Sequence, residues 1–481
     1  GAVNFHISGY NGDGYFSYKY HYANLNGRIN YSYDDRYVAE FGFSYFGNDA
    51  YAKGNQWAFY PSVSAAWVLS NEAFLKDSKV VDLLKLRLSY GRSGFADSGA
   101  TGVLSNYSSN GRYLFKDYYT NSYVGSFYMG SGEGVWQSSL VHMFLANAGV
   151  HAEKSSKYNV GIDAELFGKL HLSADAFIDK RTDILTLDNS MMGYYGKNYY
   201  FDNIGKMTNK GVELSAVWND LRANWGYSIN GSVSFNRNKI DYMAEVAPAY
   251  SYNAQTGRPY GTLIGLVADG FYDVDDFNAD GSLREGLPVS SYQNTVRPGD
   301  VKYRDLNRDG RIDDYDRTYQ LYAAVPEIYY GFSVELKYRG FGVSAYFQGV
   351  AHSTLETTLS SIYQPLYGND RNVSEYYMEH RWSRFNTEGR YPHLTTLANG
   401  NNYTQSSLWT ENGNFLKLRT LQAYYKLPSK IARKLRMREC SFYFRGLNLF
   451  SADHVGILDP EYVSTGYPSS RSYQIGLNVI F

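Results

Sequence analysis

The sequence predicts an all-β protein that forms part of a transmembrane antiparallel β-barrel. Three observations favour this fold: long segments alternate apolar and polar residues, tight turns join some of them in pairs, and the composition is unusual. The 481 residues include 50 Tyr and 46 Gly but only 11 Pro. Tyr favours strands and gathers where apolar and wet surfaces meet. A tilted strand crosses a bilayer with about 9–11 residues, so low hydropathy does not exclude a membrane protein.

Composition and motifs argue against several other classes. A formal charge of −1 gives the chain no overall basic field for nucleic acid. Cys440 is the single cysteine, so this chain has no internal disulfide and no cysteine metal cluster. The nine His lack HExxH spacing, and no G-x-S-x-G or phosphate-binding glycine loop stands between a strand and a helix. We therefore expect no enzyme and no catalytic residues.

The clearest strands come in pairs with a tight connection. Residues 158–166 place Tyr, Val, Ile, Ala and Leu on one face, and residues 170–178 repeat the pattern after a turn at residues 167–169. Residues 330–338 and 341–347 form a second such pair, joined at Arg339-Gly340. The aromatic ends of this second pair are typical of the interface girdles of a membrane barrel.

The same reading of the whole chain predicts about 13 strands, with one more before residue 12. They lie near residues 17–33, 36–47, 57–70, 82–94, 150–166, 169–184, 206–218, 223–238, 328–338, 341–351, 413–426, 437–450 and 470–481. The short connections lie near residues 34–35, 71–81, 167–168, 219–222, 339–340 and 427–436. The long connections alternate with them and lie near residues 48–56, 95–149, 185–205, 239–327, 352–412 and 451–469. Such alternation indicates an outer-membrane barrel, with short periplasmic turns and long extracellular loops.

The last segment alternates in the same way. Tyr473, Ile475, Leu477, Val479 and Phe481 share one face of the expected final strand. Outer-membrane proteins commonly end in an aromatic strand that the barrel assembly machinery reads, so Phe481 is a candidate assembly signal. The alternative is an ordinary amphipathic strand that happens to end in Phe.

Ordered strings along the chain resemble the SusC/RagA-type TonB-dependent transporters of Bacteroidota. They are "YDDRYVAEFGFSYFGN", "FYPSVSAAWVLSNEAFL", "LLKLRLSYGRSG", "KYNVGIDAELFGKLHLSADAFIDKRTDIL", "GKMTNKGVELSAVW", "GDVKYRDLNRDGRIDDYDR", "GNFLKLRTLQAYYKLP", "FRGLNLF" and "LDPEY". Each string alone is weak, but the ordered set is specific and covers nearly the whole chain. One departure is "FGNDAYAKG", which replaces the usual polar, Asp- and Ser-containing run after the second signature strand.

The resemblance implies a multi-pass barrel in the outer membrane of a Gram-negative bacterium. Family members are about twice as long and enclose an N-terminal plug within about 22 strands. Residues 1–481 would then be the C-terminal barrel portion, with the plug and first strands on a cleaved portion or another chain. Open strand edges cannot face lipid, which agrees with a missing portion.

The resemblance also implies a function and partners. The function would be active import of an oligomeric nutrient, an oligosaccharide first and a peptide second. Ligand would be held under a SusD-like surface lipoprotein, and TonB would act through the plug. A passive porin or adhesin barrel, and a soluble or secreted all-β binding protein, are the alternatives.

One local motif predicts a metal. "DLNRDGRIDDYD", residues 305–316 and hereafter the acidic turn, has the spacing of a calcium loop. The expected ligands are Asp305, Asn307, Asp309, the carbonyl of Arg311, Asp313 and Asp316. Gly310 supplies the turn, and Asp takes the last position, where Glu is usual. The alternative is a metal-free turn held by its own side chains and nearby Arg. A second stretch, "DFNADGSL" from Asp276, begins similarly but has Leu287 at position 12 and is interpreted as a polar loop.

Aromatic clusters in the long connections are the candidate substrate contacts. They lie in residues 112–128 and 193–201, and the expected contacts are Tyr118, Tyr119, Tyr194, Tyr195, Tyr199 and Tyr200. Tyr rings stack on sugars or peptide side chains while their hydroxyls form directional hydrogen bonds. The alternative is packing within the loops themselves.

Overall fold

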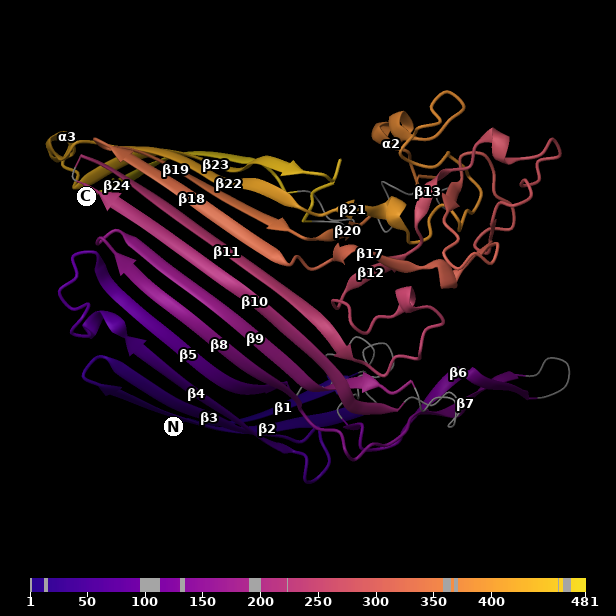
Figure 1. The fold of residues 1–481 in the computed structure, drawn as a ribbon, viewed down its shortest axis with the longest axis horizontal. Helices are drawn as coiled ribbons and strands as arrows, with labels where there is room; N and C mark the ends of the chain where they lie inside the picture. Colours follow the sequence, from indigo (N-terminus) through magenta and orange to yellow (C-terminus); the bar gives the residue numbers. More distant parts are fainter. Residues whose placement is uncertain are drawn as a thin grey trace. The chain divides into compact units, whose positions relative to one another are not determined.

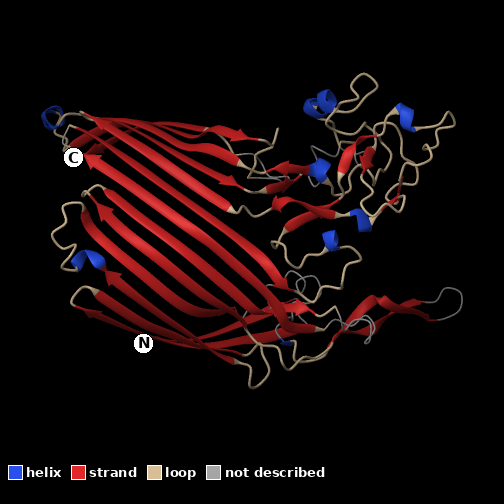
Figure 2. Cartoon of the chain, in the orientation of Figure 1, coloured by secondary structure: helices blue, strands red, loops and turns tan. Residues whose placement is uncertain are grey.

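The computed structural model is dominated by strands, and the helices of its described residues are short (Figure 2). The described residues are 2–12, 16–95, 113–129, 135–189, 200–222, 224–357, 365–366, 371–456, 458–461 and 469–481. The chain divides into two compact units. The first comprises residues 1–213, 236–247 and 255–258, and the second comprises residues 214–235, 248–254 and 259–481. No helix in the described part of the chain is long and apolar enough to cross a membrane.

Fourteen long strands form the main sheet, which matches the expected number. In the first unit each strand of the following series pairs antiparallel with the next. They are β1 (Ala2–Gly12), β2 (Phe16–Tyr33), β3 (Tyr37–Asn48), β4 (Trp57–Val68), β5 (Val81–Phe95), β8 (Glu153–Leu166) and β9 (Leu170–Leu187). β10 (Phe201–Leu221) and β11 (Trp225–Tyr242) follow in the strand order.

In the second unit the long strands also pair antiparallel (Figure 1). Its long strands are β18 (Ile328–Tyr338), β19 (Phe341–Ala351), β22 (Phe415–Lys426), β23 (Glu439–Asp453) and β24 (Ser472–Ile480). Phe481 follows β24 directly and is 88% exposed. Neither β1 nor β24 has a second strand partner among the described residues, so the sheet edges are open there.

The tight turns explain the register of the hairpins. Tyr338 pairs with Phe341 across Arg339 and Gly340, which have φ of 44° and 94°. Two consecutive positive φ angles are typical of the type I′ turn, whose twist matches that of the flanking strands. Phe167 and Gly168 also have positive φ, and the amide of Lys169 donates to the carbonyl of Leu166. Sequence alone locates both turns correctly.

The connections carry small elements that sequence analysis missed. In the first unit, β6 (Tyr118–Met129) and β7 (Val135–Phe144) form a hairpin, and η1 (Leu69–Asn71) follows β4. The second unit adds short strand pairs. These are β12 (Thr262–Gly265) with β17 (Thr318–Ala323), β13 (Ala268–Phe271) with β15 (Val301–Tyr303), β14 (Val289–Ser290) with β16 (Arg311–Ile312), and β20 (Thr354–Glu356) with β21 (Thr410–Asn412). Its helices are η4 (Ser251–Asn253), η5 (Val274–Asp276), η6 (Asp314–Asp316), α2 (Glu375–His380), η8 (Ser407–Trp409) and α3 (Ser429–Lys434).

The alternation of connection lengths holds, but it is not strict. The connection at residues 49–56 belongs to the long series, yet it is shorter than the connection at residues 69–80 in the short series. The long series otherwise reaches 85 residues at residues 243–327. The long series therefore exceeds the short series in length because of its longest connections, and not at every position.

Burial is inverted relative to a soluble sheet protein. Large side chains that are almost fully buried lie in the connections, among them Trp409, Tyr272 and Tyr377. The long strands instead expose apolar side chains, such as Ile29 at 69% and Leu88 at 63%. The packed cores of the molecule therefore lie in its loops, and one face of the sheet is apolar and exposed.

Candidate functional site

The acidic turn lies in the second unit and is held by its own side chains. The carboxylate of Asp305 accepts the amides of Arg308 at 2.6 Å and Gly310 at 2.8 Å. The side chain of Asp309 accepts the amide of Arg311 at 2.9 Å. Asp316 is fully buried and accepts the amide of Leu306 at 2.8 Å. These bonds form a rigid turn from the residues expected as ligands.

The described residues contain no group of three or more His, Cys, Asp or Glu side chains arranged to hold a metal. The carboxylates of the acidic turn point to backbone amides instead. Burial raises the pKa of Asp316; hydrogen bonds from backbone amides oppose this, and the charge of Asp305 adds to it. Calcium binding at this turn therefore stays a prediction.

The predicted aromatic contacts are only partly described. Tyr194, Tyr195 and Tyr199 lie outside the described residues, and nothing is described of the side chain of Tyr118. Tyr119 is half-exposed on β6 and stacks on His142 of β7 at 4.5 Å between ring centroids. Tyr200 precedes β10, and its carbonyl accepts the amide of Asp188 at 2.8 Å. Substrate contact by these residues stays a prediction.

The hairpin β6–β7 has a polar anchor next to that stacked pair. Asp117 lies 3.1 Å from Nε2 of His142 and accepts the amide of Ala146 at 2.9 Å. The hydrogen bond from Ala146, the largest effect, lowers the pKa of Asp117, and His142 contributes in the same direction. Tyr119 is thereby presented on a hairpin whose base is fixed.

A buried polar network joins two long connections of the second unit, and sequence analysis missed it. Asp300 is 1% exposed, and one carboxylate oxygen accepts Asn399 at 2.8 Å and Asn402 at 2.7 Å and lies 2.9 Å from Nε2 of His393. Asn401 accepts the hydroxyl of Ser290 at 2.7 Å. Buried polar groups specify a unique arrangement only when they are satisfied, as these are.

Stacked aromatic rings lie in the same part of the second unit as this polar network. Tyr377 of α2 stacks on Tyr391 at 4.9 Å, and Tyr391 lies 6.0 Å from Trp409. The indole of Trp409 donates to the carbonyl of Asn402 at 2.7 Å. Burial raises the pKa of Tyr377 far above its ordinary value. Residues 290–303 and 377–409 are thus packed with the order of a domain core.

An ion-pair cluster ties the last long connection to β22. The ammonium of Lys417, which is 4% exposed, bonds the carboxylates of Asp459 and, at 2.7 Å, Glu461. Arg419 pairs with Glu461 as well. Burial alone would raise the pKa of Asp459, but Lys417 and the amides of Glu461 and Ser469 outweigh it and lower the pKa to about 2. We call Lys417, Arg419, Asp459 and Glu461 the clasp.

A second charged group lies on the polar face of the sheet in the first unit. Arg87 of β5 makes two bonds to Asp163 of β8, at 2.8 and 2.9 Å, and two to Asp175 of β9, at 3.0 and 2.9 Å. Gly161 leaves room for it, since a Cβ there would lie 2.4 Å from Asp175 and 2.8 Å from Arg87. Lys85 pairs in register with Asp163 on the same face, so two cations accompany the two carboxylates at this point.

The comparisons with known proteins agree with this architecture. The model of the family "TonB dependent receptor-like, beta-barrel" matches residues 4–336. This chain belongs to that family. TonB-dependent receptor P3 of Formosa agariphila is 27% identical over 489 residues, which cover 95% of this chain and 45% of that protein. TonB-dependent receptor SusC of Bacteroides thetaiotaomicron is 25% identical over 480 residues, covering 95% and 43%.

A solved structure shows the same fold. A structure of the RagAB peptide transporter superposes with a TM-score of 0.71 at 19% identity, covering 96% of this chain and 48% of that chain. The resemblance to SusC/RagA-type proteins is confirmed. The chain spans about half the length of the curated relatives it matches.

Proposed function

We propose that this chain is the C-terminal barrel portion of a TonB-dependent importer that takes up an oligomeric nutrient across the outer membrane of a Gram-negative bacterium. The observation that carries the proposal is the exposed apolar face of the strands. Leu88 and Val160 are 63% and 55% exposed on neighbouring strands, while the alternate position carries the ion-paired Arg87. Such a face is stable against lipid, and the opposite face suits a polar lumen.

The partners follow from the family and the open edges of the sheet. We propose that an N-terminal portion supplies the plug and the remaining strands and so pairs the free edges of β1 and β24. TonB would act through that plug, and the barrel assembly machinery would read Phe481 at the carboxyl end. The connections of the second unit that pack around Asp300, Tyr377 and Trp409 would form the surface that a SusD-like lipoprotein contacts. Long ordered loops commonly carry such contacts.

We propose an oligosaccharide as the substrate, with a peptide as the second candidate. Exposed Tyr119 beside His142 supports the first, because flat aromatic faces stack on sugar rings. The structural similarity to RagAB, a peptide transporter, supports the second. Transport of either substrate would require no catalytic residue, and we propose that the chain is not an enzyme.

Uptake in living cells tests this function. The native organism would be supplied with a labelled oligosaccharide and, separately, a labelled peptide, with and without the gene for this chain. We expect uptake of one substrate to require this chain and to stop when TonB is removed. Uptake that depends on this chain but persists without TonB would contradict the proposal and favour a passive porin.

A further inference from the structure

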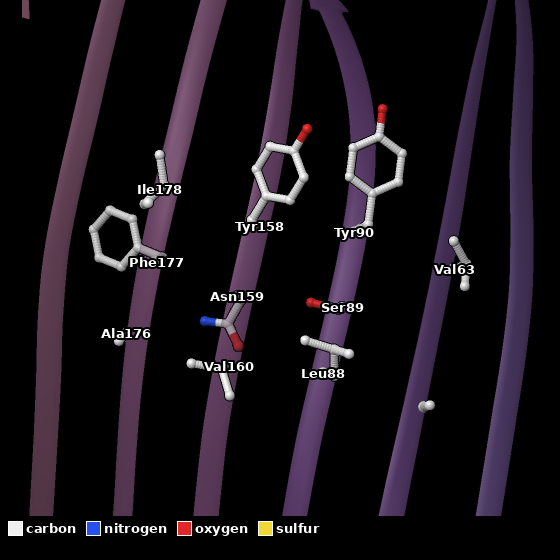
Figure 3. Close-up of a pocket in the computed structure, with 11 residues that line it drawn as sticks. Val63, Leu88, Ser89, Tyr90, Tyr158, Asn159, Val160, Ala176, Phe177 and Ile178 are labelled. Carbon is white, nitrogen blue, oxygen red and sulfur yellow. The ribbon is translucent and has the colours of Figure 1, made fainter.

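A hollow lies on the exposed apolar face of the first unit (Figure 3). Its volume is about 430 Å³, within the range of about 300–1,000 Å³ found for ligand pockets. Two neighbouring rows of outward side chains surround it, each crossing β4, β5, β8 and β9. One row is Val63, Tyr90, Tyr158 and Ile178, and the other is Ala65, Leu88, Val160 and Ala176.

The shape of the hollow comes from the sizes of these side chains. Ala65 and Ala176 are small and stand at the two ends of their row, next to the bulkier Leu88 and Val160. The rings of Tyr90 and Tyr158 lie side by side with centroids 5.1 Å apart, and their hydroxyls point the same way (Figure 3). The hollow therefore has apolar walls and one hydroxylated end.

A basic row lies beyond the tyrosines. Arg92 pairs in register with Ser156, and Ser156 pairs with Lys180, so these residues form the next row on the same face, two residues along each strand from the tyrosine row. Arg92 and Lys180 are exposed, and neither forms an ion pair with another described residue. Lys154, the next basic residue on this face, is already paired with Asp183 at 2.7 Å. The row lies toward the ends of β5 and β8 that lead into the long connection.

We propose that the hollow and the basic row bind one anionic phosphorylated lipid of the outer membrane. One acyl chain would lie in the hollow, and the phosphate would lie between Arg92 and Lys180. The two side chains start about 10 Å apart, two strand spacings, and both are long enough to reach one phosphate. Arg is suited to bidentate phosphate contacts. This inference rests on the proposed function only for its placement of the strands in a membrane.

Native mass spectrometry tests the proposal on the whole transporter, purified in mild detergent and supplied with phosphatidylglycerol or phosphatidylcholine. We expect one tightly retained phosphatidylglycerol and no equivalent retention of phosphatidylcholine. The double variant Arg92→Gln, Lys180→Gln should retain phosphatidylglycerol at least about 10-fold less, the equivalent of about 1.4 kcal/mol. Ala176→Trp, which fills the hollow and leaves both charges, should also reduce retention.

The matched control is Lys76→Gln, Lys79→Gln, which removes the same charge from the short connection at the other end of β5. Its retention should equal that of the unmodified protein. Equal retention by the Arg92, Lys180 double variant, or an equal loss in the control, would overturn the proposal. So would efficient cross-linking of Leu88→Cys between two copies, because a second copy would then cover the hollow.

A failure of the proposed function would look different. Uptake would then persist without TonB, while retention of phosphatidylglycerol would still depend on Arg92 and Lys180. A chain without the heat-dependent gel mobility of a folded membrane barrel would remove the membrane placement on which both proposals rest. A folded barrel that retains lipid without regard to Arg92 and Lys180 would refute only the lipid site.

Discussion

Replacing Lys417 with Met should release the last long connection from β22. The ammonium of Lys417 is almost fully buried and bonds both Asp459, which is 8% exposed, and Glu461, which is 27% exposed. Removing one partner of a buried ion pair costs about 3–5 kcal/mol, because the remaining charge is left without compensation. Glu461 keeps its pair with Arg419 and some solvent, so we expect a cost of about 3 kcal/mol.

Hydrogen exchange within the clasp measures this effect locally. The amide of Glu461 donates to Asp459 at 3.0 Å, and the amide of Ser469 donates to it at 2.9 Å. A loss of about 3 kcal/mol corresponds to roughly a 100-fold fall in protection. The matched control is Lys426→Met on the same strand, whose pair with Glu439 is 51% and 33% exposed and should contribute less than about 1 kcal/mol. Equal protection in Lys417→Met and the unmodified protein would refute this reasoning.

Three further predictions follow from the same contacts. The folded-state pKa of Asp459 is lowered to about 2, so its contribution to the clasp is complete above about pH 4 and is lost as the pH falls through about 2. The protection of the Glu461 amide, measured relative to intrinsic exchange at each pH, should fall only in that window. Millimolar calcium should slow hydrogen exchange in the acidic turn. Asp309→Asn should abolish that protection, although its side-chain oxygen can still accept the amide of Arg311. Equal protection by calcium in both proteins would contradict calcium binding. Gly161→Ala should separate Arg87 from its carboxylates and cost about 1–3 kcal/mol in thermal unfolding, whereas Gly231→Ala, with nothing within 4 Å of the new Cβ, should cost less; equal costs would contradict this role for Gly161.

The strands of the sheet could be predicted because their signals are local. Period-2 alternation and the turn at Arg339-Gly340 each depend on a few consecutive residues. Strand ends are less well placed: β10 begins at Phe201, although alternation suggests residue 206, and β11 extends to Tyr242 rather than to residue 238. Continued backbone pairing near the loops, where side chains no longer alternate clearly, accounts for the difference.

The packed loops could not be predicted because their contacts join distant parts of the sequence. Asp300 and Asn402 are 102 residues apart, and neither lies in a periodic segment. The clasp spans more than 40 residues, although "LDPEY" and the strand containing Lys417 both belong to the family strings. The one signal of the clasp in the sequence is Lys417 itself. A charged residue at that strand position indicates contact with other polar groups. The hairpin β6–β7 lies in a connection that was expected to contain no strand.

The most direct test of the account is to purify the complex from native outer membranes in mild detergent and identify each co-purifying polypeptide by mass spectrometry. We predict that this chain appears only after detergent extraction, together with a plug-containing N-terminal portion and a SusD-like lipoprotein. Recovery of residues 1–481 as a water-soluble monomer without either partner would contradict the account.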